Sequence, residues 1–549
     1  MLDKRVFYVL TGIIAAHLLL TPFTKVEESF TIQAVHDILK YGIYDISNYD
    51  HIKFPGAVPR TFIGALIVSS FSWVAMWIGK FDILGDILGS NLSIQILSRF
   101  VIGCMNSLSL AILVDATDKV LLKTYDREME DYKNKEEKAQ VKHPRLQKVS
   151  TWFIILLGTQ FHIMYYSSRP LPNFVISLPL SNIALALAIR ERYDIAIWLL
   201  SFATVVFRLE LGALCAGLAM YGLMEGQTNW VEVIKSGLGG ILVGSGLSGA
   251  IDSYFWGRWC IPELVSFKFN VVSGKSAVWG TEPPYSYLTK YLPRIFLPAT
   301  VPIFARKGYS VSPKSIKVVA NAILYHLIIL SLQPHKEWRF IVYIIPPATI
   351  LASIGLSDTF SMLNEASIWI RSIFKAVILL LPAVSLLATA FMSYVSSLNY
   401  PGGEALQVFN NYAIRNNISD VTVHLDVYTC MTGASLFGQL PDKYNITYDK
   451  TEDESLSTLW HKFDYVIATT SEPLPVDGNY TWQLVESPKA FDHVNLRLLF
   501  NSFNNEVKHG LPLLKCIYQQ RSIRPLLSLI DKAIFKSHKL GIYKRDSAA

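Results

Sequence analysis

The sequence carries little charge for its length. Only 17% of its 549 residues are Asp, Glu, Lys or Arg, against about 25% in soluble domains, and 51% are hydrophobic. A soluble protein of this size needs more polar residues than these to cover its surface. The composition therefore argues against a soluble cytosolic enzyme, and more strongly against a disordered or collagen-like chain.

Motifs for nucleotide and metal chemistry are also missing. There is no GxxxxGK(S/T) or HExxH, the single GxGxxG match (244–249) lies inside the apolar block 236–252, and the five scattered cysteines form no CxxC, so ATP, dinucleotide, zinc or iron–sulfur use is not indicated. The net charge of +7 is modest, and its Lys and Arg residues lie largely in short loops between apolar blocks. This distribution suits the positive-inside pattern of a membrane protein better than a nucleic-acid face.

Long apolar blocks are what the sequence has instead. An α-helix needs roughly 20 apolar residues to cross the hydrocarbon, and the blocks predict a polytopic α-helical membrane protein with about 11–13 transmembrane helices. The first block has no small-residue cleavage site, so we expect a retained anchor. The blocks are Val6–Phe23, 61–79, 95–115, 152–166, 174–188, 195–224 (two short helices), 236–252, 289–304, 316–332, 340–356 and 374–397.

Charged loops set the expected orientation. Segment 117–148 holds nine Lys or Arg, although seven acids dilute the signal, and it is predicted to be cytosolic with 190–192 and 306–317. The opposite, lumenal side then receives 24–60, 167–173, the neighbourhood of 208–210, 253–288, 333–339 and the tail. Between residues 24 and 117 the expected helices do not fit strict alternation between the two sides of the membrane, because there is one crossing too many or too few. Segment 61–79 or 80–94 is therefore a candidate re-entrant segment.

The tail differs from the rest of the chain. We expect a transmembrane catalytic module over 1–397 and a small lumenal α/β domain over 398–549. The runs VTVHLDVYT (421–429) and FDYVIATT (463–470) are typical of buried strands. Sequons at Asn417, Asn445 and Asn479 agree with a lumenal, glycosylated side.

Ionisable residues gather just past predicted helix ends on the lumenal side. Glu27 and Glu28 follow the first block, and a carboxylate there suits a general base facing a hydroxyl acceptor. The alternative, at about even odds, is a turn in which two acids cap a helix N-terminus. Asp50, His51 and Arg60 are candidate ligand contacts in the same loop. A rigid interfacial turn with a snorkelling arginine is slightly favoured for Arg60.

Three further clusters carry cations. Arg169, in SSRPLPNF (167–174), could bind a phosphate bidentately or anchor its helix in the headgroups. Arg208 and Glu210, in FRLE, are candidate substrate contacts, although a structural salt bridge is favoured because unpaired charges at that depth are expensive. His335, Lys336, Glu337 and Arg339 crowd the segment QPHKEWRF (333–340). Cations there could hold a phosphate or pyrophosphate leaving group.

These motifs resemble a known family. HKEWRF closely matches the H-K-E-x-R-F signature of the endoplasmic reticulum mannosyltransferases that use dolichyl-phosphate mannose, glycosyltransferase family 22 with the GT-C fold. The resemblance runs from about residue 6 to about residue 450 and is closest to the α-1,6 branch, which acts on a lipid-linked Man7GlcNAc2 oligosaccharide. It is carried by PFTKVEESFTIQAVHD, YDHIKFPGAVPRTF, SSRPLPN, FRLE, DSYFW, WGTEPPYSY, PHKEWRF and NYPGGEA.

The resemblance implies an inverting transfer of mannose on the lumenal side of the endoplasmic reticulum membrane, with no metal or other cofactor and no nucleic acid. Glu27 or Glu28 would be the base, with Glu27 slightly favoured because it aligns with the first acid of the family's Asp-Glu pair. His335, Lys336, Arg339 and Arg169 would bind the donor phosphate. Asp50, His51, Arg208, Glu210 and Glu337 would contact substrate or orient the cations.

Other functions stay open. An α-1,2 enzyme of the same family would share the motifs. A transporter of lipid-linked sugars would predict charges near the bilayer midplane and a half-to-half repeat, and neither is visible. A non-catalytic scaffold would not need acids and cations at adjacent lumenal helix ends.

Overall fold

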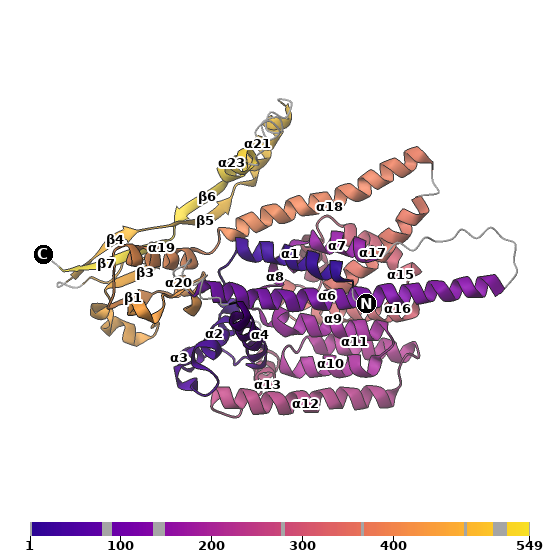
Figure 1. The fold of residues 1–549 in the computed structure, drawn as a ribbon, viewed down its shortest axis with the longest axis horizontal. Helices are drawn as coiled ribbons and strands as arrows, with labels where there is room; N and C mark the ends of the chain where they lie inside the picture. The colour runs from indigo at the N-terminus through magenta and orange to yellow at the C-terminus, as the bar shows by residue number, and fades with distance from the viewer. Residues whose placement is uncertain are drawn as a thin grey trace. The chain divides into compact units, whose positions relative to one another are not determined.

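The computed structural model describes residues 3–79, 91–134, 149–275, 280–363, 367–476, 480–508 and 524–547 (Figure 1). They form two compact units. Unit 1 takes the described residues of Met1–Leu20, Phe30–Lys80 and Gln95–Ser393 and is helical. Unit 2 takes those of Thr21–Ser29, Phe81–Ile94 and Tyr394–Ala549 and holds the described β-strands. The expected fold class, a largely helical chain of apolar helices with a C-terminal α/β domain, is confirmed.

The helices of unit 1 vary widely in length. They are α1 (Lys4–Leu20), α2 (Val26–Tyr41, which begins in unit 2), α3 (Asp50–Lys53), α4 (Ile63–Gly79), α6 (Leu92–Asn134), α7 (Val149–Gly158), α8 (Phe161–Tyr166), the π-helical turn η2 (Asn173–Ser177), α9 (Leu178–Ile189), α10 (Tyr193–Val206), α11 (Leu211–Met224), α12 (Trp230–Trp256), α13 (Pro262–Phe267), η3 (Lys268–Val272), η5 (Tyr287–Tyr291), α14 (Leu292–Ile295), α15 (Thr300–Val311), α16 (Lys314–Ser331), η6 (Trp338–Ile344), α17 (Ile345–Leu363) and α18 (Ile368–Ser397).

Five stretches of helix among the described residues are long and apolar enough to cross a membrane. Five more apolar helices have only 10–17 residues, and they include the two short helices α10 and α11 expected within 195–224. The number of crossings therefore stays a prediction. The five long stretches are Leu92–Glu130, Trp230–Trp256, Lys314–Ser331, Trp338–Leu363 and Arg371–Ser397.

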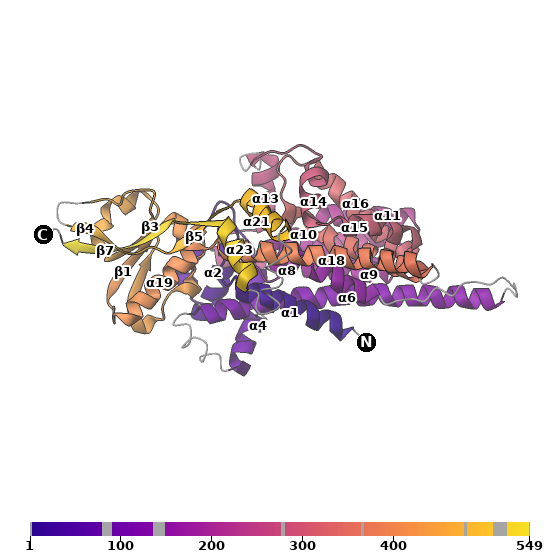
Figure 2. The same cartoon turned by 90° about the horizontal axis from the view of Figure 1, so that it is seen from above.

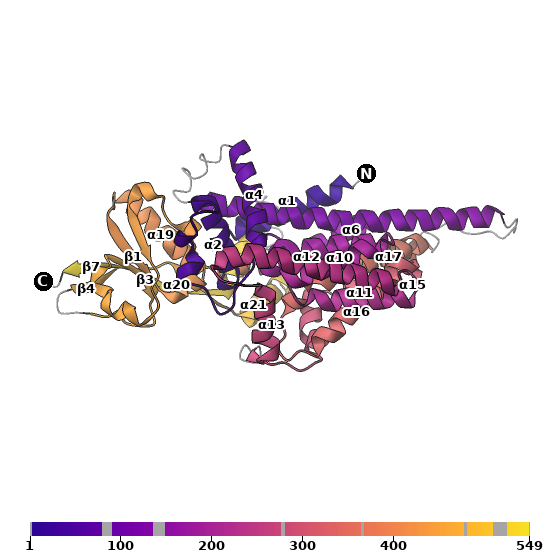
Figure 3. The same cartoon turned by 90° about the horizontal axis from the view of Figure 1, so that it is seen from below.

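Helix α12 matters most for the site. Its first turn is capped by Asn229, whose side chain accepts a hydrogen bond from the amide of Glu232 at 3.0 Å, and it ends at Gly257, which has the left-handed φ of 60° that favours glycine. Helices α10 and α12 run side by side (Figure 3). A Cβ at Gly240 would collide with the carbonyl oxygen of Trp198, so glycine permits this close approach.

Three expectations about residues 1–397 differ from the structure. Glu27 and Glu28 lie in the first turn of α2, not in a loop, because negative charge is favourable at a helix N-terminus. Helix α6 runs to Asn134, well into the predicted loop 117–148, because this stretch lacks Gly and Pro. The predicted single helix over 289–304 is instead η5, α14 and α15, interrupted around Pro298.

Unit 2 contains a five-stranded sheet in the order β2-β1-β3-β7-β4, with β2, β1 and β3 parallel and β7 antiparallel to both its neighbours. Helix α19 packs on it (Figure 2), burying Leu406 and Phe409 with Val423 and Ile467. The strands expected in 421–429 and 463–470 are confirmed as β1 and β3. The elements are α19 (Pro401–Arg415), β1 (Val421–Leu425), α20 (Val427–Met431), β2 (Ile446–Asp449), β3 (Tyr465–Thr469), β4 (Tyr480–Glu486), β5 (Lys489–Val494), α21 (Leu496–Lys508), α23 (Arg524–Ala533), β6 (Ile534–His538) and β7 (Leu540–Ser547).

Candidate active site

Glu210 is the hub of the polar centre of unit 1. Its Oε1 accepts hydrogen bonds from Arg208 Nε at 2.8 Å and from Asn173 Nδ2 at 2.7 Å, and Tyr343 Oη lies 3.4 Å away. The Arg208–Glu210 ion pair is about nine-tenths buried on both sides, so the favoured salt-bridge interpretation of FRLE is confirmed. One carboxylate oxygen thus joins the segments FRLE, SSRPLPN and the turn η6 after HKEWRF.

Glu337 orients two cations of the HKEWRF segment. Its carboxylate pairs with Arg339 and lies 3.1 Å from His335 Nε2. Burial alone would raise the pKa of Glu337, but Arg339 and His335 outweigh it and the pKa is lowered. His335 Nδ1 faces the carbonyl oxygen of Gly280 at 3.0 Å, so the ring is held from both sides. The arrangement matches the expectation that Glu337 orients a cation.

Lys336 is placed differently from the other cations. Its side chain is only 4% exposed, and its ammonium donates to the carbonyl oxygens of Gln333 and, at 3.2 Å, of Glu282. Glu282 also forms an ion pair with Lys290 and accepts a hydrogen bond from Tyr291 at 3.1 Å. Lys336 therefore fastens the segment 333–340 to the segment that follows Gly280, and its ammonium is occupied by backbone oxygens.

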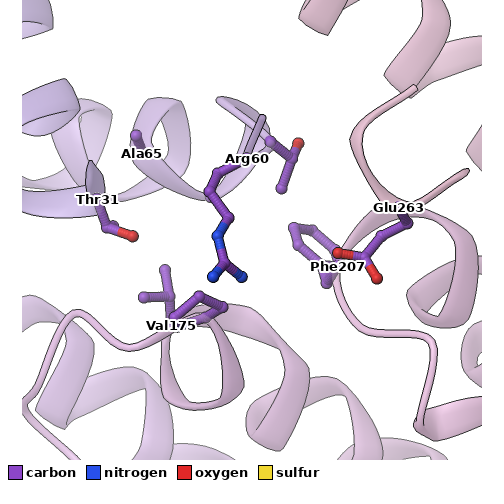
Figure 4. Close-up of a pocket in the computed structure, with 9 residues that line it drawn as sticks. Thr31, Arg60, Ala65, Val175, Phe207 and Glu263 are labelled. Carbon is purple, nitrogen blue, oxygen red and sulfur yellow. The ribbon is translucent and has the colours of Figure 1, made fainter. Parts of the chain in front are cut away.

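A pocket beside these ion pairs contains Arg60 and Glu263. It is lined by Thr31, Arg60, Thr61, Gly64, Ala65, Pro172, Val175, Phe207 and Glu263. In Figure 4 the guanidinium of Arg60 extends across the pocket toward Val175, and the Glu263 carboxylate enters from the side of Phe207. Glu263 also accepts a hydrogen bond from the amide of Leu209 at 3.0 Å, which connects the pocket to FRLE.

Burial shifts both charged groups of the pocket. It raises the pKa of Glu263 to about 7, against the opposing pull of Arg208. Burial and the neighbouring Arg208 lower the pKa of Arg60 to about 10, so Arg60 stays a cation near neutral pH. Arg339 also repels Arg60 electrostatically. Three guanidinium groups thus share one electrostatic neighbourhood.

The last turns of α12 hold the segment that carries Arg60. The Asp252 carboxylate accepts hydrogen bonds from the amide of Phe62 at 2.8 Å, the hydroxyl of Thr61 at 3.1 Å and the hydroxyl of Ser248 at 2.5 Å. The indole N–H of Trp256 donates to the carbonyl oxygen of Arg60 at 3.0 Å. Helix α12 therefore fixes the backbone on both sides of Arg60.

His51 packs against the end of α12, and the backbone of Asp50 contacts α2. His51 is buried, its Nε2 lies 2.9 Å from the carbonyl oxygen of Phe255, and its ring packs on Phe62 and Trp256. The amide of Asp50 donates to Asp37 at 2.7 Å. Neither Asp50 nor His51 is among the residues that line the Arg60 pocket.

Arg169 is buried against aromatic rings. It donates to the hydroxyl of Tyr165 at 2.6 Å, and its guanidinium carbon lies 4.4 Å from the ring centroid of that tyrosine. Tyr166 in turn packs against Trp338, with centroids 4.7 Å apart. Arg169 is therefore connected to the HKEWRF segment through aromatic contacts with Tyr166 and Trp338.

Glu27 and Glu28 differ in exposure. Glu28 is buried and Glu27 is exposed at the start of α2. Thr31, which lines the Arg60 pocket, follows Glu28 by three positions, so these two side chains share one face of α2. The pair therefore stands one helical turn before a pocket residue on the same helix.

Two acids of the site were missed by the sequence analysis. Asp252 is the one acid in the last two-thirds of an apolar 27-residue helix, and an intramembrane acid is a signal of function in itself. Glu263 offered a weaker signal, an acid directly after Pro262 in the predicted lumenal segment 253–288. Asp252 begins the motif DSYFW, but the motif alone does not disclose its partners Phe62, Thr61 and Ser248.

The chain was compared with known families and proteins. The Alg9-like mannosyltransferase family matches residues 6–433, more than three-quarters of the chain. The chain belongs to this family. The family assignment agrees with the motifs, since the matched span includes FRLE, DSYFW and HKEWRF.

Named enzymes are similar to the chain over most of its length. The chain is 39% identical over 548 residues to the Saccharomyces cerevisiae Dol-P-Man:Man(7)GlcNAc(2)-PP-Dol alpha-1,6-mannosyltransferase, covering 98% of this chain and 97% of the relative. It is 36% identical to a probable enzyme of the same name from Schizosaccharomyces pombe, covering 85% and 77%. Among solved structures, ArnT from Cupriavidus metallidurans bound to undecaprenyl phosphate aligns with a TM-score of 0.49 and 10% identity over 85% of this chain and 93% of that one.

Proposed function

We propose that this protein transfers mannose from dolichyl-phosphate mannose to a lipid-linked Man7GlcNAc2 oligosaccharide and forms an α-1,6 linkage. The observation that carries the proposal is the 39% identity to the yeast enzyme of that name over nearly the whole of both chains. The buried hub of Glu210 supports it, because it gathers the motifs FRLE and SSRPLPN and the turn η6, which begins within HKEWRF, at one place in unit 1.

The reaction is a displacement with inversion at the anomeric carbon. Glu27 or Glu28 removes the proton of the acceptor's C6 hydroxyl, and the oxygen forms a bond to the anomeric carbon. The bond from that carbon to the phosphate oxygen breaks, and dolichyl phosphate leaves with the electron pair. A positioned base contributes about 10²–10⁴-fold to such a step. The cations of the site meet the charge that develops on the phosphate.

The site is proposed to face the lumen of the endoplasmic reticulum, together with residues 398–549. Asn417 and Asn445 are exposed sequon positions in unit 2, which supports this side; Asn479 lies outside the described residues. Protease treatment of sealed microsomes tests the orientation. Digestion of the tail by protease on the cytosolic side would show that the orientation is the opposite of the one proposed.

The transfer is proposed to need no metal or other cofactor. The arginines around Glu210 supply positive charge for the donor's phosphate. Within the described ranges, His, Cys, Asp and Glu side chains form no group of three suited to a metal ion. Activity that survives EDTA unchanged supports the proposal, and restoration of a lost activity by a divalent cation contradicts it.

The deciding experiment uses the full chain, purified into lipid nanodiscs, with dolichyl-phosphate mannose and the lipid-linked Man7 acceptor. We expect one mannose to be added and an α-1,6-specific mannosidase to remove it. An α-1,2 linkage would assign the chain to the other branch of its family. Absence of transfer by well-folded protein, with the yeast enzyme active in parallel, would contradict the enzymatic proposal and favour a scaffold or transporter.

A further inference from the structure

Most cations that the sequence offered for phosphate binding already have partners. Arg208 is paired with Glu210, Arg339 with Glu337, and Arg169 donates to Tyr165. Lys336 is occupied by two backbone carbonyl oxygens. The guanidinium of Arg60, by contrast, makes no ion pair or hydrogen bond with any residue that the structure describes.

Arg60 is also poorly placed to be satisfied by solvent alone. It lies inside the pocket, in the field of Arg208 and Arg339, and the acid opposite, Glu263, is held neutral for much of the time near pH 7. A buried charge without a partner is costly, because its lost hydration is not replaced. The pocket therefore offers a guanidinium that no described carboxylate pairs with, and an anion would balance its charge.

We propose that Arg60 binds the phosphate of the polyprenyl-phosphate sugar donor and that Asp252 and Trp256 are positioning residues that hold it there. This inference rests on the proposed function for the identity of the donor. A phosphodiester carries one negative charge, and the departing phosphate monoester gains a second. An arginine fixed beside it stabilises the transition state more than the ground state.

The contacts of α12 with the backbone around Arg60 explain how Asp252 and Trp256 would position it. Arg60 lies between two hydrogen bonds to one helix, from Trp256 to its own carbonyl and from the Phe62 amide to Asp252. The ring of Trp256 also stacks on Phe30 of α2, with centroids 5.9 Å apart and planes within 5°. Without these contacts the guanidinium would sample several directions and lose part of its advantage.

Two phosphate sources are possible, the donor's monophosphate and the diphosphate of the lipid-linked acceptor, and kinetics separates them. With Arg60→Ala we expect KM for the donor to rise and kcat to fall, so that kcat/KM for the donor drops about 10- to 100-fold. KM for the acceptor should change less than about twofold. Arg60→Lys should lie between, because it keeps the charge and loses the fork. Arg258→Ala, an exposed arginine just after α12, is the matched control and should match the parent.

The positioning role has its own readout. Asp252→Ala should reproduce the donor defect, whereas Asp252→Asn keeps an oxygen that accepts from Phe62 and should recover most of the affinity. The double variant Arg60→Ala/Asp252→Ala should be little worse than Arg60→Ala, because both act on one interaction. Additive defects, or a defect of Asp252→Asn equal to that of Asp252→Ala, would overturn the positioning role.

Direct binding distinguishes failure of this inference from failure of the proposed function. Binding of short-chain dolichyl phosphate to the full chain, measured by titration in detergent, needs no mannose transfer. We expect Arg60→Ala to weaken it about 10-fold or more while Arg258→Ala does not. Unchanged binding by folded Arg60→Ala protein, or a defect confined to the acceptor's KM, would overturn the assignment. Should Arg60→Ala fail to fold, Arg60→Lys and Arg60→Gln carry the same comparison.

Discussion

Arg208 and Glu210 are two positions apart in the chain and share a 2.8 Å ion pair whose carboxylate oxygen is also bound by Asn173. The pair is therefore a structural junction as well as a charged group near the pocket. The motifs FRLE and SSRPLPN, which lie far apart in sequence, meet at this single oxygen, and Tyr343 of η6 lies 3.4 Å from it. Several expected outcomes depend on it and on its neighbours.

Removing the Glu210 carboxylate should destabilise the protein severely. Glu210→Ala leaves Arg208 buried without its partner and the Asn173 amide with only the Tyr343 hydroxyl, and loss of one partner of a buried pair costs about 3–5 kcal/mol. Thermal unfolding in detergent measures the loss. Glu225→Ala is the matched control, because its pair with Lys314 is about half exposed and should contribute about 0–1 kcal/mol. Equal losses of thermal stability in the two variants would contradict the role of Glu210 as a structural junction.

Glu27→Gln and Glu28→Gln separate the two candidate bases. Loss of the true base should lower single-turnover transfer about 10²–10⁴-fold, because glutamine cannot accept the acceptor's proton. The other variant should retain much more activity. Dolichyl phosphate binding serves as the control for folding and should persist in both. Near-parent turnover in both variants would show that the two acids only begin helix α2.

Arg339 should act through its charge and its geometry. Arg339→Ala removes a cation in the electrostatic neighbourhood of the pocket and leaves Glu337 with only His335, so we expect turnover to fall about 10²–10³-fold, as for loss of a single transition-state donor. Arg339→Lys should give an intermediate loss because ammonium lacks the bidentate fork. Single-turnover transfer with saturating donor is the measurement. Parent-like rates for both would make the HKEWRF segment an anchor at the membrane interface.

Glu263 should give stability a pH dependence with a defined sign. Its pKa in the folded protein is raised to about 7 from an ordinary value near 4.5, so the folded state binds the proton more tightly than the unfolded state. Its contribution to stability is complete below about pH 4.5 and is lost as pH rises through about 7. The parent's melting temperature should therefore fall relative to that of Glu263→Gln between pH 5.5 and 8. A difference in melting temperature between the two proteins that stays constant over this pH range would contradict the raised pKa of Glu263.

Local sequence pattern was enough to predict helices and strands, but it was not enough to predict which residues contact one another. Period-two runs located β1 and β3, and a polar interruption separated α10 from α11, because each signal lies within a few residues. Besides local contacts, Lys336, His335 and Glu210 each make contacts with segments 37 to 133 positions away. Motif reasoning therefore identified a cluster of cations without distinguishing Lys336, which binds backbone, from Arg60, which has no such partner within the described chain.

The close contact between α10 and α12 at Gly240 connects the site to a position far from the pocket. Gly240 lies twelve positions before Asp252, about 18 Å along the helix axis, and α10 leads directly into the FRLE segment. A bulky side chain at Gly240 would push the two helices apart and shift the supports of Arg60 and Arg208 together. An inherited substitution at this glycine would therefore impair donor handling from a distance, and a variant classified only by its separation from the pocket would be misjudged as harmless.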